Sequence, residues 1–305
     1  MNSSNRTIQT AEQGDLESIW TLLKDVLFLE TFGPELIEEK LFTNPAPDRQ
    51  AFETLVCHDG GQLVGVMQVV RRPADRKGWI GLFAVRADRQ RAGIASELLD
   101  RSLEGLRGDG VEEVEALAIP GNYFTPGIDP RYTSGLCFLE KRGFQRFRDC
   151  VNMIGRLDDA FDTSTDTKRL EDAGLVIRRA TANDGPLLDA YFSRDFGDDW
   201  RMEAGLALAN DPPALHLALK DGAVIAFSAH STQNREWGFF GPMGTSPETR
   251  GLGIGRLLLQ LCLNDLRDAG HQTAVIPWVG PIPFYSHHAG CTVDRVFWRY
   301  RRYLT

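Results

Sequence analysis

The sequence predicts a mixed α/β fold, with helices packed on a mixed sheet, in which one kind of domain occurs twice. Three observations support this fold class. The chain has 305 residues, about twice the usual size of a domain. A short glycine-containing motif occurs around Gly93 and again around Gly253. Each copy stands between a strand pattern and an amphipathic helix pattern, which predicts a repeated strand–loop–helix unit.

The expected elements follow the same order in both halves. Apolar runs bounded by turn residues predict the strands, and apolar residues at helical spacing predict the helices. In the first half these are strands at 51–58, 62–72 and 78–86, a helix from Ile94, and a strand at 114–119. In the second half they are strands at 214–220, 223–230 and 236–244, a helix at 252–268, and a strand at 273–276. A strand–loop–helix–strand unit requires one parallel pair in an otherwise antiparallel sheet.

Three landmarks recur in one order and indicate a duplication. They are Ile8–Ala11 and Ile177–Ala180, Gln90–Ala95 and Arg250–Gly255, and Phe138–Phe144 and Phe284–Cys291. Between the copies, the segment Asp158–Thr167 is polar and turn-prone, as linkers are. The predicted organisation is an N-terminal domain at 1–160, a linker at 161–172 and a C-terminal domain at 173–305.

The composition is that of an ordinary globular chain. A net charge of −8 with 42% hydrophobic residues argues against disorder. It also argues against a strongly basic nucleic-acid binder, because neutralising phosphates requires a surplus of Lys and Arg. No apolar run approaches the roughly 20 residues of a membrane span, and no signal peptide is expected. The spacing of the five cysteines and six histidines predicts neither disulfides nor a metal site. Because no disulfide framework is expected, the predicted location is the cytoplasm.

The glycine motif is suited to an anion. Small residues let the backbone approach a ligand closely, and the first turn of the following helix offers unpaired N–H groups and a partial positive charge. A pyrophosphate is the natural occupant. For one copy a plain strand-to-helix turn explains the glycines equally well, but two copies in the same context favour a ligand. A Rossmann fingerprint requires its third glycine one place after Gly255, and no P-loop string occurs.

The two motifs resemble the acetyl-CoA-binding motif of the GNAT N-acetyltransferase superfamily. They read Gln90-x-x-Gly93-x-Ala95 and Arg250-x-x-Gly253-x-Gly255. The residues before each motif and the later segments Phe138–Phe144 and Phe284–Gly290 are similar to that family as well. The resemblance covers nearly the whole chain as two GNAT-like acyl-CoA N-acyltransferase domains in tandem. This arrangement is similar to that of mycothiol synthases, although no residue selects that class.

The resemblance implies an N-acetyltransferase that uses acetyl-CoA as cosubstrate. A primary amine of a small molecule or peptide would attack the thioester directly, without a covalent enzyme intermediate. Loop amides would hold the pyrophosphate, and the preceding strands would pair with pantetheine. The implied cofactor-binding residues are Val85, Gln90, Arg91, Ala92, Gly93, Ile94, Ala95, Ser96 and Asn122 in the first half, and Met243, Thr245, Arg250, Gly251, Leu252, Gly253, Ile254, Gly255 and Arg256 in the second.

The resemblance also implies catalytic residues, and these favour the second half. Tyr285 is the candidate general acid at the leaving thiolate, although the usual spacing to the later glycine places Ser286 there. The matching residue of the first half, Leu139, cannot donate a proton, so Tyr132 or Tyr123 would have to substitute. Asn122 fits a family position near the cofactor, where the second half has Pro277-Trp278.

Glu236, at the expected start of a strand, is the candidate general base, and His230 is a weaker one. Chemistry is therefore expected in the C-terminal domain, with the N-terminal domain as the alternative catalytic one. A second alternative is a CoA-binding regulatory or interaction protein without turnover. A third is an aminoacyl-tRNA-dependent transferase, which the acidic balance disfavours. The sequence fixes neither the acceptor nor the oligomeric state.

Overall fold

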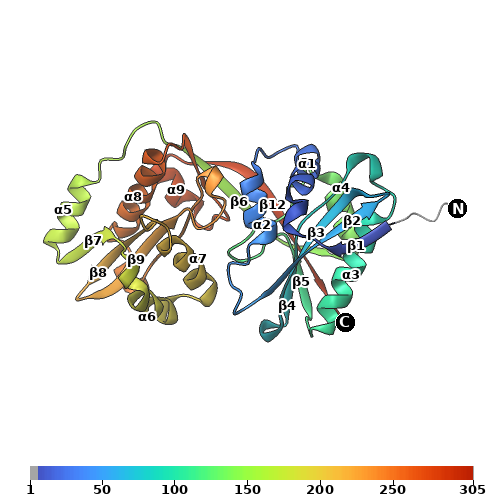
Figure 1. Ribbon diagram of the computed structural model, residues 1–305. Helices are drawn as coiled ribbons and strands as arrows, with labels where there is room; N and C mark the ends of the chain where they lie inside the picture. The colour runs from blue at the N-terminus through green and yellow to red at the C-terminus, as the bar shows by residue number, and fades with distance from the viewer. Residues whose placement is uncertain (1–5, 305) are drawn as a thin grey trace. The chain divides into compact units, whose positions relative to one another are not determined.

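The computed structural model describes residues 6–304 and separates the chain into two compact units (Figure 1). The first unit is Met1–Cys150 together with Val296–Thr305, and the second is Val151–Arg295. Both units are mixed α/β structures, so the predicted fold class is confirmed. Among the described residues, no helix has the length and apolar character that a membrane span requires.

The first unit is built on a sheet with the strand order β1-β2-β3-β4-β5-β12. The strands are β1 (Arg6–Thr10), β2 (Ala51–Asp59), β3 (Gln62–Arg72), β4 (Lys77–Val85), β5 (Glu113–Ala116) and the end of β12 (Thr292–Tyr303). The helices are α1 (Leu16–Val26), α2 (Pro34–Phe42), α3 (Ile94–Gly108) and α4 (Thr133–Lys141). Strand β4 pairs in parallel with β5, whereas β1–β2, β2–β3, β3–β4 and β5–β12 are antiparallel pairs, which confirms the predicted mixed sheet.

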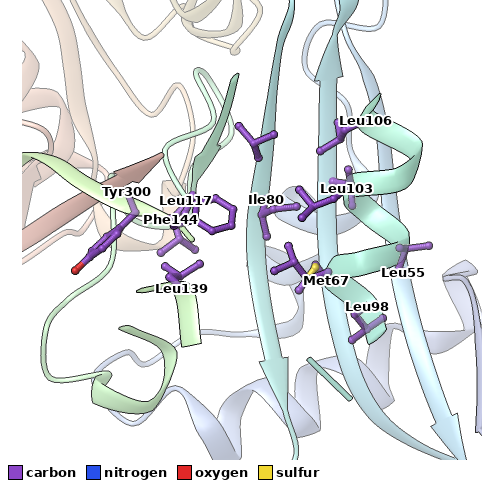
Figure 2. Packing of buried hydrophobic residues seen from close by; sticks show 14 of the residues in the cluster. Leu55, Met67, Ile80, Leu98, Leu103, Leu106, Leu117, Leu139, Phe144 and Tyr300 are labelled. Carbon is purple, nitrogen blue, oxygen red and sulfur yellow. The ribbon is translucent and has the colours of Figure 1, made fainter. Parts of the chain in front are cut away.

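The core of the first unit lies between α3 and one face of this sheet. Figure 2 shows Leu98, Leu103 and Leu106 of α3 beside Leu55, Met67 and Ile80 of the strands. Because successive side chains of a strand lie on opposite faces, Gln68 points the other way, and it donates a hydrogen bond to the Lys40 carbonyl of α2. Helices α2 and α3 therefore cover opposite faces of the sheet.

The second unit contains a four-stranded antiparallel sheet in the order β10-β9-β8-β7. These strands are β7 (Leu175–Arg179), β8 (Leu215–Lys220), β9 (Ala223–His230) and β10 (Phe240–Thr245). A further strand, β11 (Thr273–Ile276), pairs antiparallel with the last residues of β6 (Gln145–Arg156). The helices are α5 (Ser164–Asp172), α6 (Gly185–Asp195), α7 (Asp198–Leu208), α8 (Ile254–Asp268) and α9 (Ile282–Ala289). Apolar residues of α8 pack on the strands, and an aromatic cluster from α6 and β9 forms a separate core.

Most elements stand where the sequence predicts them, with two differences. The strand expected at 236–244 begins at Phe240, because Arg235–Trp237 form a 3-10 turn between two residues of left-handed conformation. Glu236 therefore lies on a turn and not on a strand. The expected linker contains helix α5, since Ser164–Asp172 place Leu170 at a buried position on an otherwise polar helix.

The two compact units also divide the chain differently from the sequence pattern. Residues 296–305 belong to the first unit, where Arg301, Arg302 and Tyr303 pair with β5. A repeat reveals which residues form a strand but not which copy that strand joins. The domain limits 160 and 173 inferred from the repeat remain predictions.

Tyr300 provides a test of this division. Its side chain is 1% exposed in the core of the first unit, and its hydroxyl donates a hydrogen bond to Glu140 Oε1 at 2.6 Å. We expect Tyr300→Ala to lower the free energy of unfolding by about 3–5 kcal/mol, as for other large buried aromatic residues. Tyr303→Ala, at a position that is 54% exposed, should change it by about 0.5 kcal/mol or less.

Chemical denaturation measures both values, and hydrogen exchange locates the loss. In the Tyr300→Ala chain, amides of β3 and β4 should lose protection while those of β8 and β9 keep it. Loss of protection confined to β8 and β9 would contradict the assignment of the last strand to the first unit.

Candidate functional site

In the first unit, two parallel strands part halfway along β4. Their ladder runs from Lys77, opposite Glu113, to Ile80, opposite Ala116. The last hydrogen bond between the two strands runs from the Leu117 N–H to the Ile80 carbonyl, at 2.7 Å. Strand β4 nevertheless continues to Val85. Along residues 81–85, the edge of β4 that faces β5 is therefore no longer paired with it.

The second unit shows the same parting. An isolated parallel bridge joins Phe239 to Val275, and the Val275 N–H donates to the Gly238 carbonyl at 3.0 Å. Beyond this bridge β10 runs to Thr245 beside β9, whereas β11 pairs with β6. The edge of β10 that faces away from β9 is thus open.

A β-bulge lies at the point of parting in both units. The register of β4 against β3 shifts between Phe83 and Ile80, and that of β10 against β9 shifts between Met243 and Phe240. The extra residues stand 160 positions apart in the sequence, at Gly81–Leu82 and Gly241–Pro242. A bulge bends the strand that carries it, which accounts for the divergence from the parallel neighbour.

The open edges carry backbone groups suited to an extended ligand. The Arg86 N–H donates to Val64 and the Ser246 N–H donates to Ile225, both at 2.9 Å. Because the backbone groups of successive residues point to opposite edges of a strand, the residues one and three places earlier face the open edge. These are Val85 and Phe83 in the first unit and Thr245 and Met243 in the second.

Three of these four were predicted from the sequence. Phe83 was not named as a binding residue, although it lies in the strand segment expected to pair with pantetheine and the 160-residue offset from Met243 indicates it. In the first unit the Val85 carbonyl accepts a hydrogen bond from the Gln90 side chain at 3.2 Å, so the first motif residue braces the loop against the strand.

Both glycine loops lead directly into a helix. Gly93, with φ of +90°, and Gly253, with φ of +81°, adopt the left-handed conformation that glycine tolerates without strain. The first helical hydrogen bonds are donated by Glu97 to Gly93 and by Leu257 to Gly253. The three residues between donor and acceptor, 94–96 and 254–256, therefore have N–H groups without an intrahelical acceptor. In the described chain neither helix has a side-chain N-cap, so these donors and the helix dipole suit an anion.

An arginine holds each loop from outside, which the sequence pattern did not reveal. The Arg6 guanidinium donates to the Ala92 carbonyl at 2.9 Å and pairs with Glu97 at 2.7 Å. The Arg169 guanidinium of α5 donates to the Leu252 carbonyl at 3.0 Å. Ala92 and Leu252 each precede the N-cap glycine. Two arginines from different kinds of element therefore bind the equivalent carbonyl group in the two loops.

The charges around the second loop differ from those around the first. Arg169 also pairs with Asp166 at 3.2 Å, and Asp166 pairs in turn with Arg256 in the first turn of α8. The first turn of α8 contains no acidic residue, whereas that of α3 contains Glu97. The second helix therefore presents the more favourable N-terminus to an anion.

The two bulges are filled differently. In the first unit Gln68 Oε1 accepts the Leu82 N–H at 3.3 Å, and a Cβ placed on Gly81 would lie 2.1 Å from the same oxygen. In the second unit the residue at the corresponding position, Pro242, has no N–H to satisfy. A Cβ placed on Gly241 would meet no described atom within 4 Å. The first bulge is closed by a side chain and the second is open.

Tyr285 lies beside the open bulge of the second unit. Its ring centroid is 6.0 Å from that of Phe240 and 5.2 Å from that of Phe284. The side chain is buried, which raises the pKa of its hydroxyl, and within residues 6–304 that hydroxyl has no hydrogen-bond partner. Ser286, the alternative by family spacing, is exposed.

The glycine loop joins this group through Gly255. A Cβ on Gly255 would lie 3.5 Å from both Met243 and Thr245 and 3.6 Å from the Phe284 ring. The structure thus brings together the start of α8, the open edge of β10 and the helix that carries Tyr285.

The remaining predicted residues lie elsewhere or serve the fold. The Asn122 side chain is 2% exposed, and its amide donates to the Lys40 carbonyl at 3.0 Å and, at the longer distance of 3.4 Å, to that of Thr43. Leu139 is fully buried in the first core, and the Tyr132 hydroxyl accepts the Leu29 N–H at 3.1 Å. Glu236 is exposed.

Comparisons with known proteins agree with this geometry. The family model described as Acetyltransferase (GNAT) family matches residues 16–123 and 184–287. No curated protein matches the chain. Among solved structures, the GCN5-related glucosamine N-acetyltransferase region of a fungal multi-domain GH3 β-N-acetylglucosaminidase superposes with a TM-score of 0.82 at 18% identity. That match covers 99% of this chain but 38% of the fungal protein, so this chain spans well under half of its length.

Two further structures match along both whole chains. A tandem GNAT protein from the clavulanic acid biosynthesis pathway has a TM-score of 0.72 at 15% identity and covers 98% of each chain. A GCN5-related N-acetyltransferase from Sphaerobacter thermophilus has a TM-score of 0.71 at 16% identity and covers 98% of this chain and 95% of its own. At these identities the likeness shows the fold alone. The family model matches well over half of the chain, and the chain belongs to the GNAT acetyltransferase family, with two copies of the domain in tandem.

Proposed function

We propose that this chain transfers the acetyl group of acetyl-CoA to a primary amine and that the chemistry takes place in the unit Val151–Arg295. The observation that carries the proposal is the meeting of three features there. These are an unfilled bulge at Gly241, an open β10 edge and the hydroxyl of the buried Tyr285 side chain, which makes no hydrogen bond within residues 6–304. The family membership supports acyl transfer in general. The acetyl donor, the amine acceptor and the choice of unit are proposed from the geometry of the site.

The proposed binding mode uses backbone groups. The N–H groups of residues 254–256, with the loop Arg250–Gly253, hold the pyrophosphate at the N-terminus of α8. The open edge at Met243 and Thr245 pairs with the amides of pantetheine, as one strand pairs with another. Gly255 has no side chain between these two regions, so the ligand passes from loop to strand without obstruction.

Each step of the transfer has a group on this chain. The Met243 N–H, beside the bulge, donates to the thioester oxygen and stabilises the charge that develops there. Tyr285, whose hydroxyl is protonated at neutral pH, gives a proton to the leaving thiolate. Glu236, the general base that the sequence proposes, is exposed on the turn before β10, and His230 is the competing candidate for this step.

The first unit is proposed to bind acetyl-CoA through residues 91–96 without turnover. Its loop and open edge are formed, but Gln68 fills the bulge and Leu139 replaces the tyrosine. If the second unit behaved in the same way, the chain would be a CoA-binding regulatory protein. Release of free CoA upon addition of an amine separates these two functions. Glucosamine is the first acceptor to test, because the fungal relative is described as a glucosamine N-acetyltransferase region.

The two loops are separated by charge substitutions. Gly253→Glu places a negative charge and a strained left-handed residue in the second loop, and Gly93→Glu does the same in the first. We expect Gly253→Glu to abolish acetyl transfer and Gly93→Glu to preserve it, while each variant loses one acetyl-CoA site by isothermal titration calorimetry.

Gly222→Glu is the matched control. Gly222 has a φ of +79° in a hairpin turn and no described neighbour of its Cβ position within 4 Å, so it reproduces the strain and charge away from both loops. Loss of turnover in Gly93→Glu with full turnover in Gly253→Glu would move the chemistry to the first unit.

Tyr285→Phe tests the general acid. We expect kcat for acetyl transfer to fall by about 10²-fold or more, the usual contribution of a positioned acid. Acetyl-CoA affinity and the thermal midpoint should hardly change, because the hydroxyl makes no hydrogen bond in the described chain. Tyr300→Phe, which removes a hydroxyl from the first core, is the control and should keep full turnover. An unchanged kcat in Tyr285→Phe would remove Tyr285 from the mechanism.

A further inference from the structure

A buried polar cluster beneath α8 has no part in the steps above. The Asp265 carboxylate of α8 accepts hydrogen bonds from three successive strands. Its partners are Arg179 of β7 at 2.6 Å, His216 Nε2 of β8 at 2.7 Å and His230 Nε2 of β9 at 3.2 Å. The two histidine side chains are less than 10% exposed. So many donors on one carboxylate fix the positions of both rings.

The cluster determines which nitrogen of His230 carries the proton. Burial alone would raise the pKa of Asp265, but the hydrogen bonds from His216, His230 and Arg179 hold it well below its usual range. A carboxylate only accepts, so His230 Nε2 is a donor, and Nδ1 of the neutral ring is left with a lone pair. His230 Nδ1 lies 3.0 Å from Ser231 Oγ. The Ser231 hydroxyl therefore donates to His230.

The backbone of Ser231 is strained in a way that makes this contact. Its φ is +52°, in the left-handed region that non-glycine residues rarely adopt. In a regular strand the side chains of residues 230 and 231 would lie on opposite faces. The left-handed turn brings the Ser231 hydroxyl back to the ring of the preceding residue. Ser231 itself is only partly buried.

Ser231 stands next to the point where the strands part. Its N–H donates to the Phe239 carbonyl at 2.8 Å, and Phe239 forms the bridge to Val275 beyond which β10 and β11 separate. The backbone of Ser231 therefore lies one strand away from that point. The adjacent Thr232 hydroxyl is 3.4 Å from the Gly241 carbonyl of the open bulge.

We propose that Ser231, His230 and Asp265 form the proton relay that deprotonates the acceptor ammonium in the second unit, a role that rests on the proposed acetyl transfer. Ser231 Oγ accepts a proton from the ammonium while its own hydroxyl proton passes to His230 Nδ1. The neutral amine attacks the thioester carbonyl to form the C–N bond, the C–S bond breaks, and Tyr285 protonates the leaving thiolate. The second proton that the nitrogen loses as the amide forms restores the Tyr285 hydroxyl through water. The imidazolium returns its extra proton to water. Asp265 is a positioning residue that stabilises the imidazolium, as the buried carboxylate of a catalytic triad does.

Several charged or titratable groups lie around His230. Arg179 and His216 share Asp265 with it, and Arg235 donates to the Ser231 carbonyl at 3.2 Å. His271 packs on the backbone of Gly238, and burial, followed by the proximity of His230, lowers the pKa of His271.

Two acceptors of different basicity test the relay in the full chain. Glucosamine is largely an ammonium ion at neutral pH and needs a base, whereas hydroxylamine is largely uncharged and does not. With acetyl-CoA as donor, we expect Ser231→Ala and His230→Gln to lower kcat for glucosamine by about 10²-fold. The rate with hydroxylamine should stay near that of the unmodified chain. In His230→Gln the rate with glucosamine should follow the fraction of the amine that is uncharged, and should therefore rise as the pH increases through the titration of glucosamine itself.

Ser231→Gly distinguishes loss of the hydroxyl from a purely structural effect of the substitution. Glycine suits the φ of Ser231, so this variant should unfold at a higher temperature while acetylating glucosamine as slowly as Ser231→Ala. Equal losses with both acceptors would overturn the relay, as would unchanged rates. A selective loss in Glu236→Gln but not in Ser231→Ala would assign the base to Glu236 instead. A chain that binds acetyl-CoA and acetylates neither amine would refute the proposed acetyl transfer and, with it, the relay.

Discussion

A β-bulge in one strand of each unit is the constraint on which the rest of the site depends. The additional residue turns the strand away from its parallel neighbour, and the ladder between them ends. The same insertion leaves a backbone N–H without a ladder partner, which a buried strand must satisfy or eliminate. The first unit satisfies it with Gln68, and the second eliminates it with Pro242. The choice between an amide side chain and a proline therefore decides whether space remains beside the bulge.

Much of the fold followed from local signals. Turn residues around Gly60 and Gly222, and apolar spacing after Gly93 and Gly253, depend on a few neighbouring positions and need no tertiary knowledge. The strand expected from residue 236 started late because Gly238 and Asn234, both left-handed, interrupt an apolar stretch that a pattern alone reads as continuous. Pairing partners are a different matter, since the strand Thr292–Tyr303 has the same pattern whichever unit it joins.

Sequence reasoning could locate only those parts of the candidate site that backbone groups form. Met243 and Thr245 precede a glycine loop at a fixed distance, so their place on the open edge could be anticipated. Contacts of side chains distant in sequence could not, as for Arg169 on Leu252 or Asp265 on His230. Arg6 and Arg169 lie at positions that the repeat does not relate, although each donates a hydrogen bond to the equivalent carbonyl group of its loop. Duplication preserved the backbone of the two copies and left their side chains to diverge.

The assignment of the last strand to the first unit has a consequence for biosynthesis. The ribosome makes Glu113–Ala116 long before it makes Arg301–Tyr303, yet these segments are hydrogen-bonded neighbours. Until then the nascent first unit exposes a bare sheet edge, and such edges recruit foreign strands. Its folding can finish only after the second unit has been translated. Truncation anywhere in the second half would thus leave the first half without its last strand.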